Sequence, residues 1–482
     1  MELGNLVPAP GERIVKNAAY LLVSDVGIRL ISAAVAVLVA RYLGPEQYGV
    51  LAVALALLGI AGYFTDLGLT PVMIREGTKP GANFPQLLSG TLRLRLLFAG
   101  VTTLVMVLVA WFYYPSSTVR LVILVVVIPG IWAGVFRGIG AGYFQMVQEM
   151  HYVALINTVA TLAGAGMFLT AVLAQWPLPI LALGYGLSAV VGGALGIFLV
   201  RRRVVLGIGQ YPGLTTGLPA FALGGGLGLL LPQLGPLLLP HAAGLEETGY
   251  FTAAYRVPGV LLTVPGVIAT AFYPQLFAYG NTDLQRHQTL SNRQIRLMGL
   301  LGLLIAVPIS LHGKWIAGVL FGSSWADQAG KALAVLAWTV ALASINWPLA
   351  DALTTQGLQA RRTGVQAMAA AVGAASYFAL GRALGAIGAA GAALVVEATL
   401  CLGFLLLNPA ANVLMKKALL PVMAKAPVIV LFALGMTWVL GSGWLGFVLT
   451  ALASGVAAWA VDREVRGYVR YGIRILFCRG RA

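Results

Sequence analysis

The fold of this chain is decided by residues 17–76, which read NAAYLLVSDVGIRLISAAVAVLVARYLGPEQYGVLAVALALLGIAGYFTDLGLTPVMIRE. Two apolar segments flank the tight turn Leu43-Gly44-Pro45-Glu46. Each segment is long enough to cross a hydrocarbon core about 30 Å thick as a helix. The stretch therefore predicts a transmembrane helical hairpin.

Two charges interrupt the first of these apolar segments. Asp25 and Arg29 are four residues apart, so their side chains fall on one face of a helix. A charge at the centre of a lone lipid-facing helix costs roughly 3 kcal/mol. We therefore expect this face to line a protein-protected, wet cavity, or the two charges to neutralise each other as an ion pair.

The composition identifies the class of protein. Hydrophobic residues make up 59% of the 482 residues and charged residues 10%, and the mean hydropathy is +0.89. A soluble domain has about 25% charged residues. The chain is therefore predicted to be an all-α polytopic membrane protein without a domain-sized part outside the bilayer. The two cysteines suggest no disulfide framework.

The apolar segments predict about fourteen membrane spans, an even number that places both termini on the same side. They lie near residues 17–40, 48–70, 91–113, 119–142, 151–174, 178–200, 217–239, 249–274, 295–312, 330–354, 364–385, 387–407, 420–440 and 443–461.

The positive charge is distributed unevenly across the predicted membrane. The net charge is +16, and most basic residues, Arg93 and Arg95 among them, fall on the side that holds both termini. Basic residues concentrate on the cytoplasmic side of membrane proteins. We therefore expect cytoplasmic termini in the inner (plasma) membrane and contacts with anionic lipids, and no nucleic-acid binding.

A weak internal repeat suggests two homologous halves. Glu46 and Gly49 recur 200 residues later as Glu246 and Gly249, at the start of another predicted span. We predict a six-helix N-terminal half (1–200), a cytoplasmic linker (201–216), a six-helix C-terminal half (217–410), and two extra helices with a basic cytoplasmic tail (411–482).

Glycine and proline mark helix packing and bending. Small residues four apart allow helices to approach closely in lipid, which is the expected role of Gly130, Gly134, Gly138 and Gly142. Prolines inside spans bend helices and are either hinges or tolerated kinks. They are Pro129, Pro232, Pro236, Pro258, Pro265, Pro308 and Pro348.

The chemistry-bearing residues do not indicate an enzyme. The chain has no Gly-x-x-x-x-Gly-Lys-Ser/Thr motif, and its four histidines lack the spacing of metal ligands. No nucleophile lies near a base in a pattern typical of catalysis. We expect no catalytic residue, no metal and no cofactor.

The remaining intramembrane ionisable residues are the candidate site: Asp25, Arg29, Asp66, Arg256, Asp351 and Glu397. Arg256 has no acid within four positions, so its side chain reaches the outer interface or joins Arg29 in a central cavity. Two arginines in one cavity suit a diphosphate. We expect Asp66 and Asp351 to cap helices or hydrogen-bond to neighbours. Glu397 is either a proton or cation site or a packing hydrogen bond.

Four segments resemble the polysaccharide-biosynthesis (Wzx-type) oligosaccharide flippases of the multidrug/oligosaccharidyl-lipid/polysaccharide exporter superfamily. They read RYLGPEQYG at 41–49, FTDLG at 64–68, GYFTAAYR at 249–256 and GAIGAAGAA at 385–393. The resemblance implies two six-helix bundles around a central cavity and alternating access. It also implies transport of undecaprenyl-diphosphate-linked oligosaccharide for O-antigen, capsule or exopolysaccharide, in a pathway with glycosyltransferases and a polymerase. Related lipid II flippases place arginines in the first and eighth spans, comparable with Arg29 and Arg256.

Two alternatives stay open. A drug/cation antiporter of the same superfamily is expected to use cavity acids, for which Asp25 and Glu397 are available. A membrane-embedded polysaccharide polymerase or ligase resembles proteins with a large external loop, and no predicted outward loop here is large.

Overall fold

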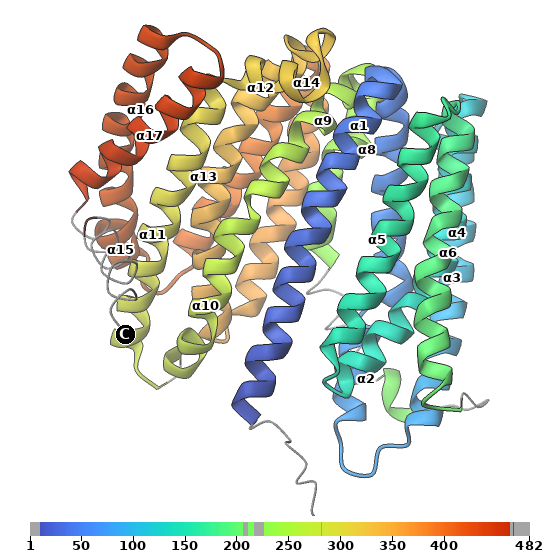
Figure 1. The fold of residues 1–482 in the computed structure, drawn as a ribbon. Helices are drawn as coiled ribbons and strands as arrows, with labels where there is room; N and C mark the ends of the chain where they lie inside the picture. Colours follow the sequence, from blue (N-terminus) through green and yellow to red (C-terminus); the bar gives the residue numbers. More distant parts are fainter. Residues whose placement is uncertain (1–9, 206–210, 216–225, 281, 463–465, 467–482) are drawn as a thin grey trace, which may run out of the picture. The chain divides into compact units, whose positions relative to one another are not determined.

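The computed structural model describes residues 10–205, 211–215, 226–280, 282–462 and 466, with side chains from Gly27 onward except that of Pro212. The Asp25 side chain, part of the predicted linker 201–216 and almost all of the basic tail lie outside this description. Every regular element in these residues is helical (Figure 1). Eleven of the helical stretches are long and apolar enough to cross a membrane.

The predicted hairpin is present in α1 (Pro10–Asp66), which changes direction at Gly44 (Figure 1). Gly44 has φ 74°, a conformation that glycine adopts without strain, and Pro45 follows it. Helix α14 (Gln359–Leu406) is broken in the same way at Gly385, where φ is 58°. Each of these elements contains two predicted spans, so the predicted all-α polytopic fold of about fourteen spans is confirmed. The predicted span 217–239 lies partly outside the described residues.

The chain forms two compact units, the first made of Met1–Pro240 and Gly244–Gly249, the second of the remaining residues. The first unit contains α1, α2 (Leu69–Gly77), α3 (Phe84–Tyr113), α4 (Ser117–Met146), α5 (Met150–Leu173), α6 (Leu178–Arg201), η1 (Pro212–Thr215), η2 (Leu231–Gln233) and the greater part of α8 (Leu234–Ala242). Met73, Leu87, Ile139, Phe144 and Leu214 join α2, α3, α4 and η1 in one buried cluster. The domain boundaries expected from the sequence stay predictions.

Glycines allow α4 and α6 to touch along their backbones. A side chain at Gly140 would collide with the backbone of Gly196, and one at Gly186 with the backbone of Val125. The close packing predicted for the glycines of α4 is confirmed, with one exception. Gly134 faces open space.

The second unit contains the greater part of α9 (Leu245–Leu261), then α10 (Thr263–Gly280), α11 (Leu284–Leu311), α12 (Gly313–Phe321), η3 (Ser323–Trp325), α13 (Gln328–Thr355), α14, α15 (Ala411–Leu414), η4 (Met415–Leu419), α16 (Leu420–Leu440) and α17 (Trp444–Val461). Its buried core joins α11, α13, α16 and α17 through residues such as Leu303, Ala341, Ile429 and Ala457.

The prolines differ in effect. The predicted eighth span is divided into α9 and α10 at Leu262, between Pro258 and Pro265. Pro129 and Pro348, in contrast, lie inside the unbroken helices α4 and α13. Proline alone therefore does not identify a hinge in this chain.

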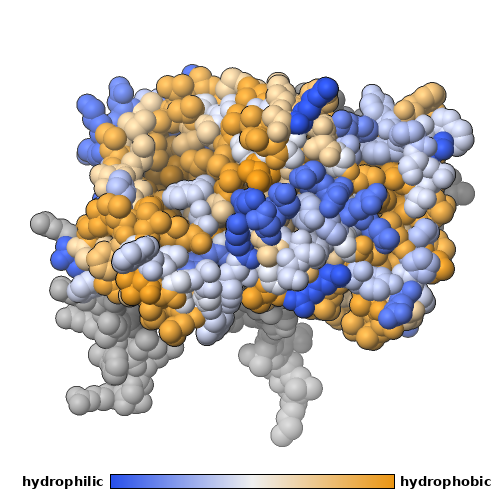
Figure 2. Space-filling view, turned by 90° about the horizontal axis from the view of Figure 1, so that it is seen from above, coloured by the Kyte–Doolittle hydropathy of each residue, from blue (hydrophilic) through white to orange (hydrophobic). Residues whose placement is uncertain are grey.

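Large apolar side chains are exposed along the helices. On α3 the exposed fractions of Leu104 and Phe112 are 61% and 75%, and on α16 that of Trp438 is 89%. Figure 2 shows broad hydrophobic areas on the face seen from above, next to hydrophilic ones. Exposed apolar side chains along the helices are expected where helices face lipid, and a tryptophan such as Trp438 favours the membrane interface.

Candidate functional site

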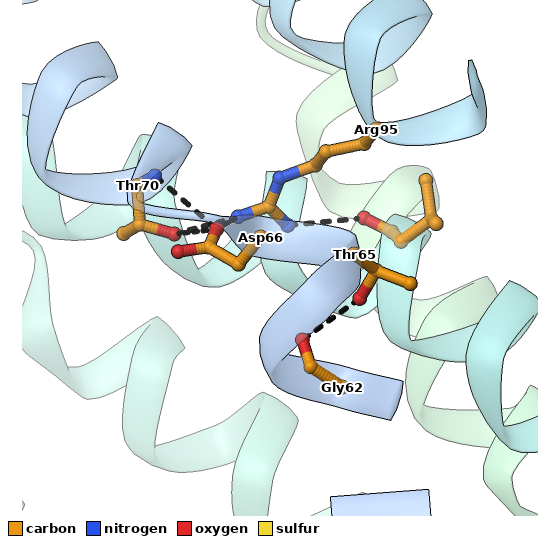
Figure 3. A network of polar contacts seen from close by, with 6 residues as sticks. Gly62, Thr65, Asp66, Thr70 and Arg95 are labelled. Carbon is orange, nitrogen blue, oxygen red and sulfur yellow. Dashed lines mark hydrogen bonds and ion pairs between the residues drawn. The ribbon is translucent and has the colours of Figure 1, made fainter. Parts of the chain in front are cut away.

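In the first unit, Asp66 forms the centre of a polar network at the end of α1 (Figure 3). Its carboxylate accepts hydrogen bonds from the Thr70 backbone N–H and hydroxyl, at 3.2 and 2.6 Å, and pairs with the guanidinium of Arg95 on α3. Arg95 also donates to the Thr70 hydroxyl oxygen at 2.6 Å and to the Val135 carbonyl on α4 at 3.4 Å. The network connects α1, α2, α3 and α4.

The structure shows that Arg95 is a buried residue. Its side chain is only 4% exposed and lies within α3, so its place on the side of the termini stays a prediction. Gly138 on α4 makes room for it, because a side chain at that position would collide with the guanidinium. The pairing of Asp66 with Arg95 was not predicted, since the two residues are 29 positions apart.

The other candidate of the first unit is in the first part of α1. The side chain of Arg29 is exposed. Its predicted partner Asp25 lies among the residues whose side chains are not described, so their ion pair stays a prediction.

In the second unit, Glu397 on α14 is held by Asn346 on α13. The Asn346 side-chain amide donates to the Glu397 carboxylate at 2.7 Å and to its backbone carbonyl at 2.9 Å. Tyr255 on α9 and Tyr377 on α14 are near enough to interact electrostatically with this carboxylate. Asn346 and both tyrosines were missed by the sequence analysis, because uncharged polar residues are common in membrane helices.

Arg256 follows Tyr255 on α9, and its side chain is half-buried. Phe251, one turn earlier, stacks on Tyr255 with ring centroids 5.6 Å apart and meets the edge of Tyr377 at 5.9 Å. These aromatic contacts fix the part of α9 from which Arg256 extends. The cluster therefore joins α9 to α14 through the residues just before Arg256.

Asp351 is on α13, in a second polar cluster of this unit. The Gln294 amide on α11 donates to its carboxylate at 3.5 Å, at the limit of a hydrogen bond. One turn further on, the Thr355 hydroxyl contacts the buried His287 ring at 2.8 Å. Asp351 thus contacts a neighbouring helix, as expected for a residue with a packing role.

Among the residues that the structure describes, no group of three or more histidine, cysteine, aspartate or glutamate side chains is arranged to hold a metal ion. Each unit instead has charged residues on its long apolar helices. The first has the exposed Arg29 and the Asp66–Arg95 pair, and the second has Arg256, Asp351 and Glu397. Such groups bind, neutralise or exchange charged ligands.

The fold is that of known flippases and transporters. A lipid II flippase, MurJ in an inward closed conformation, is 12% identical, with a TM-score of 0.76 over 92% of this chain and 98% of that chain. An inward-facing multidrug resistance MATE family transporter of the MOP superfamily is 14% identical, with a TM-score of 0.65 over 81% and 96%. A MOP superfamily transporter from Pyrococcus furiosus is 16% identical, with a TM-score of 0.59 over 85% and 98%.

At these identities the structures establish a common fold and nothing further. A comparison with curated proteins gave no match. The profile of the polysaccharide biosynthesis protein family, however, matches residues 14–279, more than half of the chain. This multi-pass membrane protein with a MOP-superfamily fold therefore belongs to the polysaccharide biosynthesis protein family.

Proposed function

We propose that the protein is a flippase that moves undecaprenyl-diphosphate-linked oligosaccharide across the inner membrane by alternating access, for synthesis of O-antigen, capsule or exopolysaccharide. The observation that carries this proposal is the family match over residues 14–279. The likeness to a lipid II flippase over 92% of the chain supports it.

The transport task explains why charged residues are kept inside the membrane. The lipid tail of such a substrate can remain in the bilayer, whereas its diphosphate and sugars are too polar to cross hydrocarbon unaided. In this proposal Arg29 and Arg256 compensate the diphosphate charge. The guanidinium group suits this role because its planar fork matches two phosphate oxygens at once.

Two acids are proposed to couple transport to an ion gradient or to the membrane potential. Asp351 and Glu397 both lie in candidate membrane spans, where an ionisable residue is costly. Of the two, Glu397 has the better-defined surroundings, since Asn346 holds its carboxylate from a neighbouring helix. A proton or cation there would change the charge near Arg256 and so its hold on an anion.

The proposed setting follows from the charge distribution. Both termini are cytoplasmic in this proposal, and the basic segments contact anionic lipid head groups. The partners are the lipid-linked substrate and, in the same pathway, the glycosyltransferases that build the glycan and the polymerase that consumes it. No chemical step is assigned to the protein.

A drug/cation antiporter is the second candidate, supported by the fold shared with a MATE family transporter. An antiporter would use Glu397 to bind cationic substrates and would have no need of the two arginines. The two functions therefore differ in which charges are essential.

The deciding experiment is lipid extraction from cells that lack the protein. The flippase predicts that diphosphate-linked oligosaccharide accumulates on the cytoplasmic leaflet and that the surface polymer is lost. Complementation with Arg29→Ala or Arg256→Ala should fail although the protein is inserted in the membrane, and lysine at either position should restore only part of the activity. Arg120→Ala is the matched control, because Arg120 lies at the exposed start of α4 over the Trp111 ring.

Two results would overturn the assignment. Full activity of the Arg29→Ala/Arg256→Ala double variant would remove the diphosphate site. No accumulation of lipid-linked oligosaccharide, together with new sensitivity to cationic dyes, would favour the antiporter.

A further inference from the structure

The internal repeat of the sequence is present in the structure as two matching helix starts. The motif Gly-x-Glu-x-x-Gly occurs at residues 44–49, in α1, and again 200 residues later at 244–249, where α9 begins. Both copies start with a glycine of positive φ, 74° at Gly44 and 95° at Gly244. Glycine adopts this conformation without strain, so each copy turns the chain into the helix that follows it.

The two copies pack against each other inside the first unit. The second copy, Gly244–Gly249, belongs to that unit although α9 continues into the second. A side chain at Gly49 would collide with the backbone carbonyl of Leu245, and one at Gly249 with the backbone carbonyl of Pro45. The helices therefore touch backbone to backbone, an approach that only small residues allow.

This contact is reciprocal. A shift of 200 residues brings Pro45 onto Leu245 and Gly49 onto Gly249, so it exchanges the two sides of the contact. An interface in which residue i contacts j and j contacts i is self-complementary, as in a two-fold symmetric dimer. The repeat of the motif thus has a structural reason, because each copy provides the glycine against which the backbone of the other packs.

The face of α9 that makes this contact also carries Arg256. Gly249 and Arg256 are seven residues apart, which is two turns of a helix, so both lie on one face. Residues 250–255 include no glycine or proline, and α9 is an unbroken helix over this stretch. The direction of the Arg256 side chain is therefore coupled to the rotation of the helix at Gly249.

The two helices differ at the position of this arginine. The residue that corresponds to Arg256 after the first copy is Ala56, which is 2% exposed. Two positions earlier both helices have alanine, Ala54 and Ala254. The packing motif is shared, whereas the charge occurs only in α9. This is the pattern expected of a repeated scaffold that carries a functional group in one of its copies.

We propose that the reciprocal contact of Gly49 and Gly249 is a positioning element, which fixes the rotation of α9 and so directs the Arg256 guanidinium. The inference rests on the proposed function, in which Arg256 compensates the charge of a diphosphate. Orientation matters there because a guanidinium fork binds two phosphate oxygens at once only when the groups are aligned. Phe251, whose ring meets Tyr377, holds the same helix from α14.

Cysteine labelling tests the direction of the side chain at position 256 without any substrate. In a chain with Cys401→Ala and Cys478→Ala, the variant Arg256→Cys is treated with a positively charged methanethiosulfonate reagent, with and without Gly249→Ala. The added methyl group meets backbone that cannot move aside as a side chain can, so the start of α9 should shift and the modification rate should change several-fold.

The same labelling with Gly49→Ala is the second arm, since this methyl group meets the other side of the contact and leaves the sequence of α9 unchanged. Gly62→Ala is the matched control on α1, because Gly62 faces open space. We expect the two contact variants to change the modification rate at Arg256→Cys and the control to leave it as it is.

Binding of undecaprenyl diphosphate, measured by native mass spectrometry of the full chain, tests the consequence for the proposed function. We expect Gly49→Ala and Gly249→Ala each to raise the apparent Kd by about tenfold, since a misplaced binding group loses most of its contribution. In Arg256→Ala, which already lacks the guanidinium, adding Gly249→Ala should raise the Kd no further. Gly62→Ala should leave the Kd unchanged.

Three outcomes would contradict the proposal, and they are distinguishable. If Arg256→Ala binds undecaprenyl diphosphate as tightly as the parent chain, the proposed role of Arg256 is wrong and its positioning has no function. If Arg256→Ala binds weakly but both contact variants bind and label like the parent, only the positioning contact is wrong. Unfolding of both contact variants under conditions where Gly62→Ala stays folded would assign the contact to stability alone.

Discussion

The Asp66 carboxylate at the end of α1 pairs with Arg95, an arginine that is 4% exposed inside α3. Thr70 hydrogen-bonds to both members of the pair. The end of α1, the start of α2 and the part of α3 around Arg95 are therefore joined by one network (Figure 3). A buried guanidinium without a carboxylate is much less favourable than the pair. Removing one charge of this pair is therefore expected to weaken the contacts among α1, α2, α3 and α4.

We expect Asp66→Asn to lower the free energy of unfolding by about 3 kcal/mol, because Arg95 stays charged in a buried position without its carboxylate. Asp66 itself is 30% exposed, which places the effect at the low end for a buried pair. Thermal denaturation in detergent measures it. Arg95→Met should also destabilise, and the double variant should be more stable than the sum of the two losses predicts. Additive losses would show that the pair does not act as a unit.

The glycine contacts between α4 and α6 give a second prediction. Gly140→Ala places a methyl group against the backbone of Gly196, which cannot move aside as a side chain can. We expect a loss of about 1–3 kcal/mol, measured as a lower thermal midpoint.

Gly134→Ala is the matched control on the same helix, since Gly134 faces open space. Alanine favours a helix over glycine by about 1 kcal/mol in water, so this variant should be neutral or slightly more stable. A loss at Gly134 equal to that at Gly140 would contradict the packing explanation.

The sequence was sufficient for the fold and insufficient for the contacts of the site. Hydropathy identified the spans, and Leu43-Gly44-Pro45-Glu46 located the turn of α1, because both signals are local. The partner of Asp66 was missed because Arg95 is distant in sequence and lies in a segment with another arginine, which resembles a cytoplasmic loop. The Asn346 contact with Glu397 connects residues 51 positions apart, and only helix packing determines it.

Glu397→Gln tests the proposed role in coupling. Glutamine keeps the shape of the side chain and can still bond to Asn346, but it can neither carry a charge nor exchange a proton. In proteoliposomes with a lipid-linked substrate we expect transport by Glu397→Gln to lose its dependence on a proton or sodium gradient. The protein should keep its thermal midpoint.

Asp351→Asn serves as the comparison, because the Asp351 carboxylate is bonded more weakly, by Gln294 at 3.5 Å, and also interacts electrostatically with Arg362. If Asp351→Asn removes the gradient dependence and Glu397→Gln does not, the coupling group is Asp351. If neither variant changes it, both acids are structural.

The burial of His312, between α11 and α12, leads us to expect that the stability of the protein depends on pH. Its ring is 1% exposed and contacts the Thr450 hydroxyl at 3.2 Å, and burial lowers its pKa below the ordinary value of about 6.5. As the pH falls below about 6.5, the unfolded chain binds a proton that the folded chain resists, so stability is lost. We expect the thermal midpoint to fall between pH 7.5 and 5.5, and to fall less in His312→Gln, which can still bond to Thr450. The same decrease in both proteins would show that His312 does not contribute to the acid sensitivity.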